Sequence, residues 1–292
     1  MKILVVAGAS AGHIFPALGL LEHLRRAYPY VSSLLVVPEK NAVGKSARLW
    51  PDIRLIAGAS VGLRLSGKNL KGLLQAFRGA VQSLRIIIDY KPDIVVGFGS
   101  IASVPMILFG WLLRTRTVLH EQNVVPGRAN RFLARFADTV CVSFAETGQS
   151  LGISGAKVKV TGNPLRTNLA RIGRKESRAF FALDPDKFTL LVMGGSQGSV
   201  AINRKCPDAL SALAAKDSFQ VIHLSGEAAF ASVSSAYRTH NIKARVFGFL
   251  QEMEYAYSAA DLAVCRAGAT TLAELKHYRL PAVFIPYPFA YE

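Results

Sequence analysis

Residues 189–203 read TLLVMGGSQGSVAIN, and this stretch decides which fold the chain can adopt. Its first five residues are mostly apolar and predict a buried strand, and the glycines that follow predict a tight turn. A helix is expected to begin near Val200. A strand, a glycine turn and a helix in this order open the nucleotide-binding units of α/β proteins.

The N-terminus has the same pattern: residues 2–7 read KILVVA, residues 8–12 read GASAG, and a helix is expected next. Two such openings predict two Rossmann-like, doubly wound α/β domains with parallel sheets, whose glycine turns face a shared cleft. We place the domains at residues 1–165 and 166–292, because the stretch 161–187 is polar and basic.

Short apolar runs with β-branched residues alternate with helix-like stretches, which is typical of βαβ units. The sequence ends directly after the last run, where a doubly wound domain continues with at least one more helix, so we expect the second domain to be truncated. The expected strands are residues 3–7, 33–37, 53–57, 94–97, 117–120, 139–142, 157–160, 189–193, 220–224, 244–247, 262–265 and 282–286.

The composition excludes several classes of protein. A hydrophobic fraction of 51% excludes disorder. The longest apolar run, residues 104–113, is far shorter than the roughly 20 residues of a membrane-spanning helix. No signal peptide precedes the first strand, and the three scattered cysteines predict reduced thiols in a cytoplasmic protein.

The formal net charge of +16 predicts an anionic partner, either a membrane surface or phosphorylated substrates. Nucleic acid is not expected, because no zinc-finger or RNA-recognition signature is present. No Asp-x-Asp cluster follows one of the glycine turns, where it could hold a divalent ion at a diphosphate, so we expect neither a metal site nor a cofactor.

Residues 70–88 predict a helix with an apolar stripe beside a basic line. Two interpretations stay open. The helix packs on a sheet with a solvated edge, or part of it meets an anionic membrane surface. In the second case the membrane face consists of Leu70, Lys71, Leu73, Leu74, Phe77 and Arg78.

The first glycine turn carries candidate chemistry. Gly8 and Gly12 let the backbone approach a ligand, and amides at the start of the next helix attract phosphate. His13 follows at the helix N-terminus, where the positive end of the dipole disfavours the charged imidazole and keeps it available as a base. The alternative is a histidine that caps or packs.

Further polar residues lie at expected strand ends and at the domain boundary. Residues 120–123 (HEQN) follow a strand, where ligands bind in open α/β sheets. Arg166 is expected to reach a phosphate or to be a surface residue of a basic linker. In the second half, Ser196 and the turn amides near Gly195 and Gly198 are placed to hold a diphosphate.

Glu274 lies on the first turns of the helix that follows residues 265–268 (CRAG). A carboxylate there suits the vicinal hydroxyls of a ribose, although a glutamate near a helix N-terminus also stabilises the dipole.

These motifs, in this order, resemble those of the MurG family, the peptidoglycan N-acetylglucosaminyltransferases of glycosyltransferase family 28. Members move N-acetylglucosamine (GlcNAc) from UDP-GlcNAc to the muramyl sugar of undecaprenyl-linked lipid I. The resemblance spans essentially the whole chain, and its strongest pieces are residues 8–18 (GASAGHIFPAL), 119–130 (LHEQNVVPGRAN), 162–166 (GNPLR), 194–198 (GGSQG) and 265–275 (CRAGATTLAEL).

The resemblance implies the GT-B fold, with the acceptor bound mainly by the N-terminal domain and the donor mainly by the C-terminal domain. It implies His13 as the general base of an inverting displacement, on the cytoplasmic face of the membrane. The residues that the resemblance implies for donor binding are Ser10, Asn123, Arg166, Ser196, Leu250, Met253, Ala269, Thr270 and Glu274. The glycines that it implies for the loops that bind the acceptor or phosphate are Gly8, Gly12, Gly99, Gly195 and Gly198.

The chain departs from the family pattern in three places. The first loop usually reads GGTGGH, but Ala9 and Ala11 replace two glycines and Ser10 replaces the threonine. The second loop, GGYVSGP in the family, reads GSIASVP at residues 99–105 and lacks two glycines. The glutamine pair that contacts the donor sugar would follow Glu292, so this chain is expected to bind poorly or to be inactive.

Three alternatives remain open from the sequence. A glycosyltransferase that acts on diacylglycerol would share the fold and the donor. A UDP-GlcNAc 2-epimerase has the same two-domain fold and needs no lipid. A non-catalytic nucleotide-binding module would bind UDP-GlcNAc without transferring the sugar.

Overall fold

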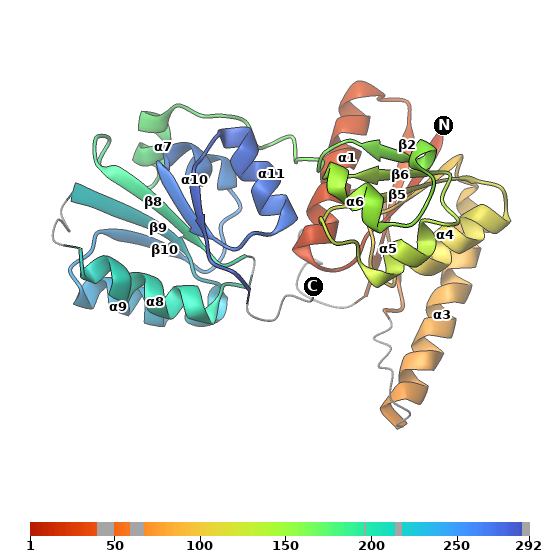
Figure 1. The fold of residues 1–292 in the computed structure, drawn as a ribbon, viewed down its shortest axis with the longest axis horizontal. Coiled ribbons are helices and arrows are strands. Elements are labelled where there is room, and N and C mark those ends of the chain that lie inside the picture. The colour runs from red at the N-terminus through yellow and green to blue at the C-terminus, as the bar shows by residue number, and fades with distance from the viewer. Residues whose placement is uncertain (40–49, 59–66, 196, 214–217, 288–292) are drawn as a thin grey trace. The chain divides into compact units, whose positions relative to one another are not determined.

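The computed structural model divides into two compact units, Met1–Thr167 and Asn168–Glu292. It describes residues 1–39, 50–58, 67–195, 197–213 and 218–287, without the side chains of residues 67–71. In each unit helices lie on a parallel β-sheet (Figure 1). The division between the units falls inside the polar stretch 161–187, two residues after the boundary expected from the sequence.

The first unit is built on a seven-stranded parallel sheet with the order β3-β2-β1-β4-β5-β6-β7. Its strands are β1 (Lys2–Val6), β2 (Ser32–Pro38), β3 (Ile53–Ile56), β4 (Ile94–Gly97), β5 (Arg116–Glu121), β6 (Thr139–Val142) and β7 (Val158–Val160). Its helices are α1 (Ala11–Ala27), α3 (Gly67–Tyr90), α4 (Ser103–Leu112), α5 (Arg128–Leu133), α6 (Ala145–Ser150) and the 3-10 turn η1 (Gly155–Lys157).

The second unit has a five-stranded parallel sheet with the order β10-β9-β8-β11-β12. Its strands are β8 (Phe188–Met193), β9 (Phe219–Leu224), β10 (Ala244–Phe247), β11 (Leu262–Cys265) and β12 (Ala282–Phe284). Its helices are α7 (Arg174–Phe180), α8 (Val200–Ser211), η3 (Glu227–Ala229), α9 (Phe230–Thr239), α10 (Met253–Ala259) and α11 (Ala269–Tyr278).

The expected class of fold, two Rossmann-like units with parallel sheets, is confirmed, and every predicted strand is present within about two residues of its predicted ends. The largest difference is at β12, which was expected to reach residue 286 and ends at Phe284. Its pairing with β11 stops at Cys265 and Phe284, and Pro286 has no backbone N–H to extend a ladder.

Alternating side chains of each central strand explain why the sheets are covered on both faces. In β1, Leu4 and Val6 belong to one buried cluster, and Ile3 and Val5 to another. Helix α1 packs on the second cluster through Ile14, Leu18 and Leu21, which follow helical spacing. Complete burial of each such side chain contributes about 1.5–3 kcal/mol.

The strand order reverses direction at one place in each sheet. In the first unit β1 pairs with β2 on one side and with β4 on the other, and in the second unit β8 pairs with β9 and with β11. At such a switch point the loops after the two central strands diverge and leave a crevice at the carboxyl ends, where α/β proteins bind ligands. The candidate sites are therefore sought after β1 and β4, and after β8 and β11.

Candidate functional site

The turns after β1 and β4 are packed against each other. A Cβ added to Gly8 would lie 2.5 Å from the Cβ of Ser100, so only glycine permits this approach. Gly99 and Ser100 both have positive φ, 78° and 71°, although Ser100 stands where the family pattern has glycine. The Ser100 Oγ accepts a hydrogen bond from the Ala102 N–H at 3.2 Å, and Ser103 Oγ donates to Gly99 O at 2.5 Å. These bonds support a left-handed conformation that is unfavourable for serine.

His13 lies in the first turn of α1, beside both turns. Its Nδ1 is 2.7 Å from Ser10 Oγ, and its ring lies against Gly99, where an added Cβ would be 3.3 Å from Nε2. Burial lowers the pKa of His13 below the ordinary value of 6.5, and the nearby Glu121 carboxylate opposes this shift. Desolvation thus keeps His13 neutral, and it acts in the same direction as the helix dipole considered from the sequence.

Glu121, to which the sequence analysis assigned no separate role within the HEQN run, organises the loop after β5. It is 2% exposed, and its Oε1 accepts hydrogen bonds from the backbone N–H and side-chain amide of Asn123 at 2.9 and 3.2 Å. Its Oε2 accepts from the Gly127 N–H at 3.0 Å and from Asn130 Nδ2 at 2.8 Å. A buried carboxylate with four donors fixes the loop and leaves the Asn123 side chain at the surface.

His120 connects the same strand end to the turn at Gly162. Its Nε2 donates to Gly162 O at 3.0 Å, and its Nδ1 accepts from Gln122 Nε2 at 3.2 Å. Burial lowers the pKa of His120, and Phe98 stacks on its ring at 5.1 Å. Within the HEQN run, His120, Glu121 and Gln122 are thus buried and hydrogen-bonded, and only Asn123 is exposed.

Arg166 belongs to the first unit, which ends at Thr167. Its guanidinium lies 4.7 Å above the ring of Phe15, on α1, and its buried Nε has no hydrogen-bond partner in the described structure. The cation–π contact holds the side chain near the start of α1.

The turn after β8 requires glycine. Gly195 and Gly198 have φ of 93° and 74°, and a Cβ on Gly198 would lie 1.9 Å from Ser225 O. Ser225 is held in turn by Asn203, whose Nδ2 donates to Ser225 O at 2.7 Å. Ser196, the predicted diphosphate ligand in this turn, lies outside the described residues.

Arg266 joins the ends of three elements at this switch point, a role that only its place after a predicted strand could have indicated. Its Nη2 donates to the Oγ of Ser199, the N-cap residue of α8, at 2.9 Å. Its Nη1 donates to Ile285 O at 3.0 Å and also to Pro286 O. The guanidinium adds a positive charge beside the N-terminus of α8, which favours an anion there.

The remaining predicted donor residues lie on α10 and α11. Ala269 and Thr270 are the first two residues of α11, whose backbone N–H groups are not used within the helix. Glu274, on the next turn, is 7% exposed, and its Oε2 accepts a hydrogen bond from the Tyr257 hydroxyl at 2.5 Å. Leu250 and Met253 lie just before and at the start of α10.

Sequence comparison gives the family. Residues 3–142 match the glycosyltransferase family 28 N-terminal domain, and residues 189–292 match its C-terminal domain. A relative from Protochlamydia amoebophila is 39% identical over 99% of the chain and 77% of its own length. The chain belongs to glycosyltransferase family 28.

Other similar proteins agree with this family 28 assignment. A Syntrophus aciditrophicus protein is 36% identical over 99% of the chain and 79% of its own length. Both relatives are named UDP-N-acetylglucosamine–N-acetylmuramyl-(pentapeptide) pyrophosphoryl-undecaprenol N-acetylglucosamine transferase. The resemblance stated from the motifs is confirmed.

Solved structures show the same fold. Acinetobacter baumannii MurG superposes with a TM-score of 0.71 at 26% identity, covering 99% of this chain and 79% of that one. A UDP-GlcNAc 2-epimerase from Neisseria meningitidis reaches a TM-score of 0.67, covering 97% of this chain and 82% of that one, at 12% identity. This second likeness concerns the fold alone.

The family 28 chain has an exposed apolar face on α3. Leu73, Leu74 and Phe77 are 62%, 61% and 70% exposed, and Arg78 beside them is exposed as well. Leu70 and Lys71 lie on the same helix, with side chains outside the described part. None of the helices in the described ranges is long and apolar enough to cross a bilayer.

The first interpretation of this helix, that the apolar stripe packs on the sheet, is wrong for these three residues. The face of α3 that packs on the unit contains Gly79, Ser83, Ile86 and Ile87, all buried. A Cβ on Gly79 would lie 2.7 Å from Ala57 O, so the helix approaches the end of β3 through glycine. The longer apolar side chains are left on other faces.

A mostly apolar pocket of about 290 Å³ lies between α3 and the two turns of the first unit. It reaches both turns through Ala9 and Ser100. Its walls include Ala9, Ile56, Ala76, Gly79, Ser100 and Val104.

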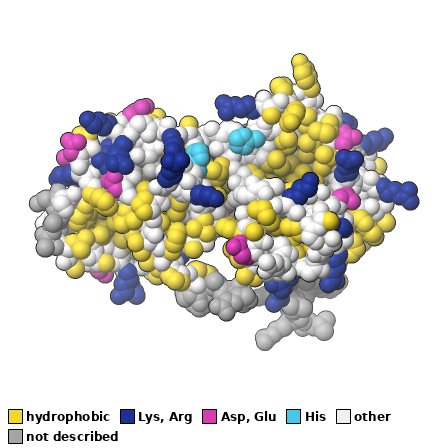
Figure 2. All heavy atoms as spheres, turned by 45° about the horizontal axis from the view of Figure 1, so that its top comes forward, with side chains coloured by type: hydrophobic (Ala, Val, Ile, Leu, Met, Phe, Trp, Pro, Cys, Tyr) yellow, Lys and Arg dark blue, Asp and Glu magenta, His cyan; other side chains and the backbone are white. Residues whose placement is uncertain are grey.

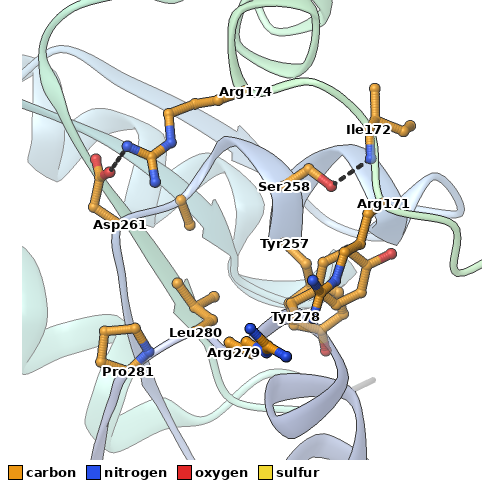
Figure 3. A pocket seen from close by; sticks show the side chains of 11 residues that line it. Arg171, Ile172, Arg174, Tyr257, Ser258, Asp261, Tyr278, Arg279, Leu280 and Pro281 are labelled. Carbon is orange, nitrogen blue, oxygen red and sulfur yellow. Dashed lines mark hydrogen bonds and ion pairs between the residues drawn. The ribbon is translucent and has the colours of Figure 1, made fainter.

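A second pocket, of about 290 Å³, lies in the C-terminal unit where β11 and β12 begin, next to Asp261 and Pro281 (Figure 3). It contains Asp261, directly before β11, where Arg174 and Arg178 bind the carboxylate at 3.1 and 2.6 Å. Here Arg171 donates to His277 O, the last turn of α11. These contacts tie residues 171–178, near the start of the unit, to α11 and to the start of β11.

Proposed function

We propose that the protein transfers GlcNAc from UDP-GlcNAc to the C4 hydroxyl of the muramyl sugar of undecaprenyl-diphosphate-linked lipid I, forming lipid II with inversion. The relatives named for this transfer are 34–39% identical over nearly the whole chain, which supports both the donor and the acceptor. The epimerases with the same fold are only 11–14% identical.

The observation that carries the mechanism is the environment of His13. With the proton on Nδ1, the imidazole donates to Ser10 Oγ, and Nε2 is left as a base beside the side-chain-free Gly99. The lowered pKa keeps the ring neutral near pH 7. We assign to Nε2 the removal of the proton from the acceptor C4 hydroxyl, whose oxygen then attacks the anomeric carbon of GlcNAc.

The leaving UDP requires stabilisation of the charge that develops on its diphosphate. The helix N-termini after the turns of β8 and β11 carry the positive ends of their helix dipoles, and Arg166 and Ser196 are proposed to add side-chain donors. Asn123 is proposed to contact the donor sugar. Leu250 and Met253 are assigned to the uracil, Ala269 and Thr270 to the sugar and phosphate, and Glu274 to the ribose.

The first unit is proposed to bind the acceptor. The turns at Gly8, Gly12 and Gly99 suit the lipid diphosphate, because small residues expose backbone N–H groups. The apolar pocket that begins at these turns suits the first isoprene units, which are bonded directly to that diphosphate.

The exposed face of α3 is proposed to contact an anionic membrane surface on the cytoplasmic side. Leu73, Leu74 and Phe77 would enter the interface, and Arg78 would meet the headgroups. Basic side chains are spread over the face drawn in Figure 2 and acidic ones are few, as the net charge of +16 requires.

Radiolabelled UDP-GlcNAc offered separately with a lipid I analogue, with diacylglycerol and without acceptor tests the proposal. We expect label only in the lipid I product. Label in diacylglycerol would indicate the related lipid glycosyltransferase, release of N-acetylmannosamine without acceptor would indicate an epimerase, and binding without turnover would indicate a non-catalytic module.

A matched pair of histidine variants tests the assigned base. His13→Ala should lower turnover by roughly 100-fold or more while UDP binding is kept, since one general base contributes about that much. His23→Asn changes a histidine of the same helix, whose Nε2 contacts Leu165 O at 3.1 Å, and should keep turnover within a fewfold. Equal turnover of the His13 variant and the wild type would contradict the assignment.

A further inference from the structure

A buried tyrosine holds the carboxylate of Glu274. Tyr257, on α10, is 2% exposed, and its hydroxyl is 2.5 Å from Glu274 Oε2 on α11. A hydroxyl that donates to an ionised carboxylate forms a short and comparatively strong hydrogen bond. The contact joins two helices whose residues are 17 positions apart, so it fixes the side chain of Glu274 from a neighbouring element.

The ring of Tyr257 cannot turn away easily. It stacks on Tyr278 with ring centroids 5.0 Å apart and an angle of 24° between the ring planes. Figure 3 shows both rings on the wall of the pocket that contains Asp261. On its other side the hydroxyl is 3.8 Å from Met193 Sδ, at the end of β8. The hydroxyl therefore has a fixed position relative to the start of the glycine turn.

We infer that Tyr257 is a positioning residue that aims the Glu274 carboxylate at the two hydroxyls of the donor ribose, and that it thereby sets the preference for ribonucleotides over 2′-deoxyribonucleotides. The inference rests on the proposed role of Glu274. A carboxylate has about four lone-pair sites, so it can accept from Tyr257 and from both ribose hydroxyls.

Two physical effects follow from this arrangement. A glutamate side chain loses much rotamer freedom when it is immobilised, and Tyr257 imposes that loss before the nucleotide binds. A site built to receive a substrate hydroxyl discriminates strongly against an analogue that lacks it, because a buried acceptor is then left unpaired. When the carboxylate is no longer held, both the affinity and the discrimination decrease.

Calorimetric titration with UDP and with 2′-deoxy-UDP tests the inference. We expect the wild type to bind UDP about tenfold or more tightly than 2′-deoxy-UDP, as for one hydrogen bond to a charged group. Tyr257→Phe should weaken UDP binding about tenfold and weaken 2′-deoxy-UDP, which retains only the 3′-hydroxyl, by less, so that the ratio falls towards one.

Tyr255→Phe is the matched control, because Tyr255 lies two residues earlier on α10 and stacks on Phe180 at 4.2 Å instead. It should keep the wild-type ratio. In steady-state assays Tyr257→Phe should raise KM for UDP-GlcNAc about tenfold with kcat within about twofold, which loss of folded protein would not produce.

Two outcomes separate this inference from the proposed function. If Glu274→Ala abolishes the preference for UDP but Tyr257→Phe retains it, the role of Tyr257 is refuted and that of Glu274 stands. If Glu274→Ala itself retains the preference, the ribose assignment of Glu274 is wrong and the inference falls with it.

Discussion

A buried histidine in the second unit makes the stability of that unit dependent on pH. His223, on β9, is fully buried; its Nδ1 accepts a hydrogen bond from the Tyr237 hydroxyl at 2.9 Å, and its Nε2 donates to Asn203 Oδ1 at 3.1 Å. Asn203 in turn donates to Ser225 O, against which the glycine turn packs. Burial lowers the pKa of His223 from 6.5 to about 4.

The size of the effect follows from these two values. Between pH 6.5 and about 4 the unfolded chain binds a proton at His223 that the folded unit does not bind, so the free energy of unfolding decreases as the pH falls. Lowering the pH from 7 to 5 should reduce it by about 2 kcal/mol through this group. The full shift corresponds to about 3 kcal/mol.

Urea unfolding followed by far-UV circular dichroism at pH 7 and pH 5 measures this loss. His223→Gln retains a donor towards Asn203 but has no imidazole to protonate, so its stability should fall by about 2 kcal/mol less than that of the wild type between these pH values. His240→Gln, a partly exposed histidine of the same unit, controls for removal of a histidine as such. An equal loss in the wild type and in His223→Gln would refute the reasoning.

Three further results are expected. Because burial lowers the pKa of His13 in the free protein, the acid limb of kcat/KM should lie below pH 6.5, and a limb above that value in a pH–rate profile would contradict its role as the base. Gly198→Ala should cost about 2 kcal/mol or more in urea unfolding and weaken UDP binding, because its Cβ would meet Ser225 O, whereas Gly155→Ala, with open space around it, should have little effect. Phe77→Ser should weaken flotation with phosphatidylglycerol vesicles by roughly tenfold, and Tyr30→Ser, at a 98% exposed aromatic of the same unit, should not; equal binding would argue against the α3 face.

Strands and turns could be predicted because their signals are local. The periodicity of apolar residues and the presence of β-branched ones indicate a buried strand, and a glycine run such as residues 194–198 indicates the turn that follows it. The packing of α3 could not be predicted in this way. Apolar spacing left open whether Leu73, Leu74 and Phe77 pack on the sheet or face a membrane, whereas the close approach to Ala57 O, which admits only the small Gly79, leaves them exposed.

The hydrogen-bond partners of the candidate site residues also could not be predicted from the sequence. Glu121 binds donors up to nine residues away, and its run of polar neighbours was a usable signal, since buried polar residues at a strand end need partners. The partners of Arg266 and Glu274 come from other helices and strands, 67 and 17 residues distant, and depend on how those elements pack.

The two glycine turns are alike in sequence, but different ionisable side chains lie next to them. Near the first turn lies an imidazole, His13, kept neutral by burial and facing a carboxylate, Glu121. Behind the second lies a guanidinium, Arg266, bonded to the N-cap Ser199 of α8. A neutral base suits proton removal and a cation beside a helix N-terminus suits a departing diphosphate, so each turn matches one half of an inverting transfer. If the roles were reversed, the His13 variant would lose UDP affinity rather than turnover.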